Sequence, residues 1–170
     1  MAPAKAARKA AKKLAGDHGR KRGDKDMLRA FEHLGRVSVL EKLLSGPSTG
    51  QIGVLIELAK RSLLQGERKS AADMLRAGEH WGFGSLASPT GADRLGDGLA
   101  PAVNAEYEHL VDKAQHHRQK HEAHFSIAIL AVYESMLESA NVAFQEGAYR
   151  RALEFARGAE ALAHVRGGTA

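Results

Sequence analysis

The residues best suited to chemistry are histidines in one polar stretch of the sequence. Five of them fall within residues 109–124: His109, His116, His117, His121 and His124. In a helix, His117, His121 and His124 stand at i, i+4 and i+7, on one face. Imidazole is a zinc ligand, so these three are the candidate metal ligands. Their polar and charged neighbours favour instead an exposed helix face whose imidazoles charge together near pH 6.5, with no bound metal or other cofactor.

Other motifs do not complete a catalytic pattern. The glycines in residues 46–53 are spaced as in a phosphate loop, but no Lys follows the second one and no strand precedes it. Asp93 and Asp97 miss the alternate spacing of a calcium loop. The chain has no Cys, which excludes thiolate zinc sites, disulfide scaffolds and cysteine nucleophiles. We therefore predict a protein that is not an enzyme and has no catalytic residues.

Positive charge is concentrated at the N-terminus. Residues 1–30 contain ten basic and three acidic residues, whereas the remaining residues contain 15 basic and 17 acidic ones. A basic segment of this kind neutralises nucleic-acid phosphates without reading base sequence. The contacts expected for that role are Lys9, Lys12, Lys13, Arg20, Lys21 and Arg22.

The basic residues 1–23 form an arm with two opposing tendencies. Ala and Lys are strong helix formers, but like charges at i,i+4 repel. We expect an arm that is disordered when free and helical against a polyanion. The alternatives are a solvated tail that aids solubility and a cleaved mitochondrial presequence. Because neither a signal-peptide core nor an apolar run of about 18 residues is present, we expect a cytoplasmic protein with no membrane partner.

Hydrophobic periodicity predicts helices and no strands. Apolar residues recur at helical spacing over residues 24–44, 51–65, 67–80 and 149–165. Ser48 or Thr49 is the expected cap of the second segment. Residues 101–145 contain no breaker and form either one helix or two with a joint near residue 120. The core face predicted for the first segment is Met27, Leu28, Phe31, Leu34, Val37, Leu40 and Leu44.

The predicted fold is all-α: five or six helices arranged as antiparallel hairpins in one domain. Residues 82–101, rich in Gly and Pro, have no periodicity and form a linker loop between a first half, 24–81, and a second half, 102–166. An apolar stripe from Phe125 to Leu137 would be covered by a second copy, so a homodimer is one alternative for the assembly.

Two helix–Gly–helix segments match each other at an offset of 81 residues. Small residues let paired helices approach closely, and a turn Gly takes positive φ without strain. The first segment has Arg68 where the second has Tyr149. The matched pairs are Leu63 and Phe144, Gly66 and Gly147, Ala71 and Ala152, Met74 and Phe155, Arg76 and Arg157, and Glu79 and Glu160.

The second segment resembles a tetratricopeptide repeat in its small residues Ala140, Ala152 and Ala159, its turn residue Gly147 and its aromatic Tyr149. The offset of 81 is not a multiple of the family's 34 residues, and a generic helical hairpin is the alternative. The resemblance implies a non-enzymatic scaffold that binds a protein or peptide partner, with Asn141 and Tyr149 as contacts. A nucleic-acid-associated protein and a helical metal-binding protein remain as alternative functions.

Overall fold

Six α-helices make up the described part of the chain, which contains no strand. In this computed structural model they are α1 (Pro3–Leu43), α2 (Pro47–Leu64), α3 (Arg68–Leu86), α4 (Ala100–Lys120), α5 (Ile127–Gln145) and α6 (Tyr149–Ala163). The structure describes residues 3–87, 100–121 and 125–166, without the side chains of residues 3–22, Pro47 and Ala100. The predicted all-α class and the number of helices are confirmed.

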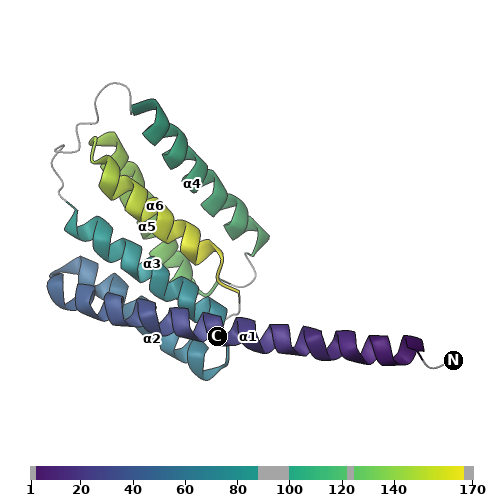
Figure 1. The fold of residues 1–170 in the computed structure, drawn as a ribbon. Helices are drawn as coiled ribbons and strands as arrows, with labels where there is room; N and C mark the ends of the chain where they lie inside the picture. The colour runs from purple at the N-terminus through teal and green to yellow at the C-terminus, as the bar shows by residue number, and fades with distance from the viewer. Residues whose placement is uncertain (1–2, 88–99, 122–124, 167–170) are drawn as a thin grey trace.

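Each half of the chain has the same plan, in which the third helix packs against the first two. Helix α3 contacts α1 and α2, and α6 contacts α4 and α5. The halves meet through α3 and α6, which run in opposite directions (Figure 1). Ser70 at the start of α3 lies at Arg166 beyond the end of α6, and Gly84 near the end of α3 lies at Phe155 of α6. Helices α1 and α4 therefore flank opposite sides of the bundle.

The turns of the α2–α3 and α5–α6 hairpins have the same geometry. Gly66 and Gly147 have φ values of 81° and 75°, and the following residues, Glu67 and Ala148, have nearly equal backbone angles. The amides of Glu67 and Ala148 donate to carbonyl oxygens five residues earlier, at 2.8 and 2.9 Å. A residue with a Cβ is strained at such φ values, so the paired glycines reflect one shared turn.

Helix α1 begins at Pro3, well before the predicted start at Asp24. Proline suits the first helical turn, and Ala, Lys and Arg favour continuation of the helix, so the intervening glycines do not end it. Helix α2 also begins earlier, at Pro47, with Gly46 at the cap position. The predicted caps Ser48 and Thr49 were wrong, because the proline fixes the first turn before them.

Residues 101–145 form two helices, which settles the alternative left open by the sequence. Helix α4 ends at Lys120 and α5 begins at Ile127. The hydroxyl of Ser126 caps α5 by accepting a hydrogen bond from the Ile129 amide at 3.3 Å. A serine with an extended backbone is a preferred N-cap, which accounts for the start of α5.

The predicted linker is helical at its beginning, because α3 continues to Leu86. A Cβ on Gly82 would stand 2.8 Å from the side chain of Leu40, and one on Gly84 would stand 2.7 Å from the ring of Phe155. These glycines are sites of close helix packing, not loop residues. Residues 88–99 of the predicted linker lie outside the described residues.

The core face predicted for α1 was partly wrong. Val37 and Leu40 are buried, but Leu28 and Phe31 face solvent, and Ala30 takes a buried position instead. The small side chain of Ala30 lets α1 lie close to α3, and the helical period then turns Leu28 and Phe31 outward. Helix α1 therefore has an apolar inner face and a second apolar face on its outer side.

Most of the stripe from Phe125 to Leu137 is covered by the chain itself, although Ile127 is 89% exposed. Ile129, Val132 and Met136 are buried in the core of the bundle, and α5 packs on α6. The stripe as a whole therefore does not require a second copy, and the homodimer stays a prediction. By length and composition α5 could cross a membrane, with a mean hydropathy of 1.3, but the core helix of a bundle has the same properties.

Candidate interaction site

The N-terminal half of α1 extends beyond the rest of the bundle (Figure 1). It contains all six predicted phosphate contacts, Lys9, Lys12, Lys13, Arg20, Lys21 and Arg22, on one continuous helix. At 1.5 Å per residue, the stretch from Lys9 to Arg22 spans about 20 Å. The structure thus places these residues along one projecting element, while their side chains lie outside the described residues.

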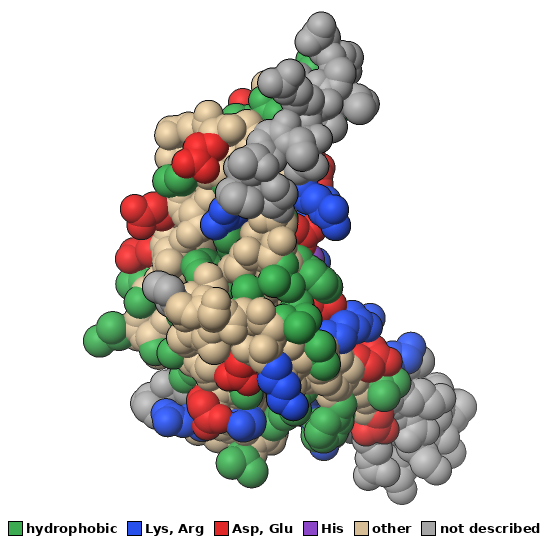
Figure 2. Space-filling view, turned by 90° about the vertical axis from the view of Figure 1, so that its left-hand side faces the viewer, with side chains coloured by type: hydrophobic (Ala, Val, Ile, Leu, Met, Phe, Trp, Pro, Cys, Tyr) green, Lys and Arg blue, Asp and Glu red, His purple; other side chains and the backbone are tan. Residues whose placement is uncertain are grey.

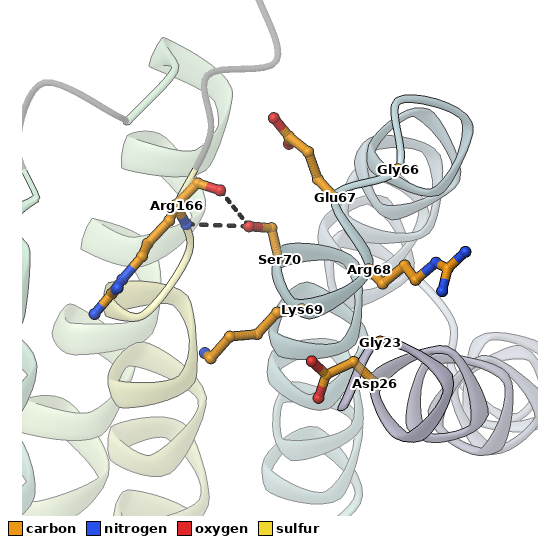
Figure 3. A pocket seen from close by; sticks show the side chains of 8 residues that line it. All are labelled: Gly23, Asp26, Gly66, Glu67, Arg68, Lys69, Ser70 and Arg166. Carbon is orange, nitrogen blue, oxygen red and sulfur yellow. Dashed lines mark hydrogen bonds between the residues drawn. The ribbon is translucent and has the colours of Figure 1, made fainter. Parts of the chain in front are cut away.

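A cleft of about 500 Å³ opens where this projecting half leaves the bundle. Figure 3 shows Arg68 and Lys69 at the start of α3, Arg166 after α6, and the acidic Asp26 and Glu67 around the cleft, with the Arg68 side chain pointing away from Lys69 and Arg166. The Ser70 hydroxyl and the backbone of Arg166 are hydrogen-bonded to each other, which ties α3 to the chain after α6. These three basic residues were not predicted as one group, because Arg166 is almost 100 residues from Arg68 and Lys69 in the sequence.

The charges around this cleft are largely paired. Arg68 lies 3.6 Å from the carboxylate of Asp24, and Lys69 forms an ion pair with Asp73. Burial raises the pKa of Asp73 despite the contact with Lys69. A second, smaller hollow between α1 and α3 adds Arg29 and Arg76. The base of the projecting half is therefore weakly positive, and the strong positive charge belongs to α1 itself.

Each half contains a buried glutamate that links its third helix to its first. Glu79 lies 2.5 Å from His33 Nδ1 and accepts a hydrogen bond from Arg36 at 2.9 Å. Burial alone would raise the pKa of Glu79, but the hydrogen bonds from Arg36 and His33 outweigh it and lower that pKa. These contacts hold α1 on α3, and so they fix the direction of the projecting half.

The equivalent residue in the second half, Glu160 of α6, links that helix to α4. It lies 2.8 Å from Lys113 Nζ and 2.9 Å from His164 Nε2. Burial opposes ionisation, yet the hydrogen bonds from Lys113 and His164 lower the pKa of Glu160. Because both buried glutamates are satisfied by basic side chains, their role is to dock helices.

The predicted histidine face is only partly formed. His121 is buried, and the rings of His117 and His121 are parallel with centroids 6.5 Å apart. His164, which directly follows α6 and was not predicted from the sequence, lies closer to His117, with the ring centroids 4.1 Å apart. Burial and the neighbouring His164 lower the pKa of His117. His124 lies outside the described residues.

Among the described residues, no group of three or more His, Asp and Glu side chains is arranged to hold a metal ion. The histidines instead lie at the junction of α4 and α6, where His164 is hydrogen-bonded to Glu160. The expectation of a fully exposed histidine face was wrong for the buried His121, because the end of α4 packs on α6.

The predicted partner contacts Asn141 and Tyr149 lie on different helices, Asn141 in α5 and Tyr149 at the start of α6. Asn141 is exposed on α5 and accepts a hydrogen bond from Gln145 at 3.4 Å. Tyr149 packs edge-on against Phe144, whose other neighbour is the stacked ring of Tyr107 at 4.1 Å. Tyr149 therefore belongs to an aromatic cluster that joins α4 to the α5–α6 hairpin.

A row of exposed apolar side chains marks the outer face of α1. Leu28, Phe31, Val39 and Leu43 are 60%, 57%, 57% and 65% exposed. Figure 2 shows hydrophobic side chains exposed between charged ones on one side of the molecule. A row of four large apolar residues on one helix face is more than scattered surface leucines. Sequence analysis had assigned Leu28 and Phe31 to the core.

No protein-family model, curated protein or solved structure matched this chain. Its function must therefore be inferred from its own charge distribution and geometry.

Proposed function

We propose that this protein is a non-enzymatic module that binds the phosphates of nucleic acid along the N-terminal half of α1. The observation that carries the proposal is that one continuous helix contains both the basic segment and the part docked on the bundle. Ten basic and three acidic residues in positions 1–30 provide the counter-charge for a polyanion. The rest of the chain, with 15 basic and 17 acidic residues, adds no net attraction.

The helical form supports this function more strongly than a flexible tail would. A helix that is already formed loses less conformational freedom when it binds than a disordered arm does. Contacts of Glu79 with His33 and Arg36 fix the docked part of α1 on α3, so the N-terminal half of the same helix projects from the bundle. Binding through phosphates alone carries no base specificity, so duplex DNA and RNA are both expected ligands.

Charge-neutral variants test the proposal. We expect Lys9, Lys12, Lys13, Arg20, Lys21 and Arg22, all replaced by Gln, to remove binding of a labelled duplex in fluorescence anisotropy at low salt. The matched control replaces the exposed Lys42, Lys60 and Lys120 by Gln and should bind as the unmodified chain does. Equal binding by both variants would contradict a role for the N-terminal half of α1.

Peptide binding by the helical hairpins is a second candidate function. The resemblance of the hairpins to a tetratricopeptide repeat supports it, as does a cleft of about 480 Å³ lined by residues of α5 and α6. Glu138, Glu146 and Arg151 line that cleft with the exposed Val142, and the excess of one negative charge favours a basic peptide with an apolar residue. In a repeat array, hairpins stack in one direction and form a continuous groove. Here the two hairpins meet through α3 and α6. The support for peptide binding is therefore the cleft on α5 and α6, and not a groove between stacked repeats.

Selection from a library of displayed basic peptides tests this second function. Enrichment by the unmodified chain that is lost in Glu138→Lys with Glu146→Lys would support it. No enrichment above an unrelated helical protein would contradict it.

A further inference from the structure

We propose that two copies of this chain associate through the outer face of α1, with the two helices antiparallel and Gly35 of one against Gly35 of the other. The inference is independent of nucleic-acid binding. It begins from the four exposed residues on that face, Leu28, Phe31, Val39 and Leu43. The inner face of the same helix is already covered by α3.

The outer face is self-complementary about Gly35. Phe31 and Val39 lie four residues before and after this glycine, and Leu28 and Lys42 lie seven residues before and after it. An antiparallel copy therefore places the large Phe31 against the smaller Val39, twice, with Leu28 against the aliphatic stem of Lys42. This is the pattern that a two-fold interface requires, because each residue meets the same partner in both copies.

Gly35 suits the centre of such a contact. A Cβ built on it would meet no atom within 4 Å, so the space above it is open. Without a side chain at this position, two helix backbones can approach more closely than they could over a larger residue. Other helical glycines, such as Gly78 and Gly82, face neighbouring helices of the same chain, whereas Gly35 faces outward.

Charge selects the antiparallel direction. A parallel pair would bring two N-terminal segments side by side, each with ten basic and three acidic residues. An antiparallel pair sends these segments in opposite directions, so their repulsion is weak.

The length of the contact indicates a weak dimer. The docked part of α1, residues 24–43, spans about 30 Å. A single helix pair of this length belongs with small interfaces, below about 1,200 Å² in total, for which micromolar dissociation constants are typical. The proposal therefore requires a concentration-dependent equilibrium between monomer and dimer.

Sedimentation of the full chain between about 5 and 500 µM, without nucleic acid, tests the association. We expect the mean mass to rise from monomer toward dimer. Phe31→Glu with Val39→Glu should abolish that rise, and because both side chains are exposed, the helical content and melting temperature should stay unchanged. Leu64→Glu is the matched control on α2, where Leu64 is 89% exposed. A chain that stays monomeric throughout, or a dimer that persists in the double variant, would overturn the proposal.

The direction of the pair is tested by cysteines, because the chain has none of its own. Leu28→Cys mixed with Lys42→Cys should give a crosslink between the two variants on mild oxidation. Leu28→Cys alone should give little crosslinked dimer. Efficient crosslinking of Leu28→Cys with itself would indicate a parallel pair and overturn the antiparallel arrangement. Sedimentation and crosslinking are both measured without nucleic acid. A negative result in them would therefore contradict the dimer and not the proposed nucleic-acid binding, and a failure to bind nucleic acid would not contradict the dimer.

Discussion

Ala77 of α3 and Gly158 of α6 lie against each other where the two helices cross, and they are equivalent positions 81 residues apart. A Cβ on Gly158 would stand 3.4 Å from the carbonyl oxygen of Ala77. Because α3 and α6 are antiparallel, equivalent residues meet at this point, as they do on a two-fold axis. The bundle is thus built like a dimer inside one chain, with α1 and α4 as its two flanks.

The two hairpin turns should respond alike to the same change. Gly66→Ala and Gly147→Ala each force a Cβ into a positive-φ conformation and should each destabilise the protein by about 1–2 kcal/mol. Urea unfolding followed by circular dichroism measures both. Gly53→Ala, in the open middle of α2, is the control and should be neutral or slightly stabilising. A large loss of unfolding free energy in only one of the two turn variants would contradict the conclusion that both turns have the same backbone geometry.

Gly84 should tolerate no side chain. The Cβ of Gly84→Ala would stand 2.7 Å from the rigid ring of Phe155, and overpacking of this kind costs about 1–3 kcal/mol. The same substitution at Gly50, which has open space around it in α2, should not destabilise the protein. Thermal unfolding of the two variants makes the comparison, and a stabilised Gly84→Ala would show that residues 82–86 are not packed as described.

The buried glutamates predict a particular acid response. Since the folded state lowers the pKa of Glu79 and of Glu160, ionisation of each stabilises the fold above its ordinary pKa, near 4.3. That contribution is lost as pH falls through the lowered folded-state pKa. Glu79→Gln should cost about 1–3 kcal/mol at pH 7, and the difference from the unmodified protein should shrink below about pH 4.

Unfolding measured from pH 7 to pH 3 checks this response. Glu108→Gln is the control, because Glu108 is exposed on α4; its substitution should change the pH profile far less than Glu79→Gln does. A Glu79→Gln variant that runs parallel to the unmodified protein at every pH would contradict the assigned role of the Glu79 carboxylate.

Periodicity predicted the helices of this fold well because their apolar faces are long and their ends carry Gly or Pro. It failed at Gly82 and Gly84, because glycines close together in a sequence also indicate a loop. In the structure these glycines are helical and leave room for the side chains of Leu40 and Phe155. The turn residues Gly66 and Gly147 were predicted from the sequence because they occupy the same position in the two matching segments, 81 residues apart.

The positive charge of the candidate site could be predicted from the sequence, but the helix that contains it could not. The basic residues of the arm are evident from composition, whereas their place on one helix with Phe31 and Val39 depends on α1 beginning at Pro3. Leu28 and Phe31 satisfied the helical spacing of a core face, yet Ala30 is buried in their place. Two apolar faces on one helix cannot be ranked from periodicity alone, because tertiary packing decides which one is covered.

The salt dependence of DNA binding tests the central claim most directly. For the unmodified chain, contacts with about six phosphates predict a slope near −5 in a plot of log binding constant against log salt. Affinity should then fall about a thousandfold between 50 and 200 mM salt, for duplex DNA of any sequence. No measurable binding at 50 mM salt, or binding that does not depend on salt, would contradict a phosphate-binding α1.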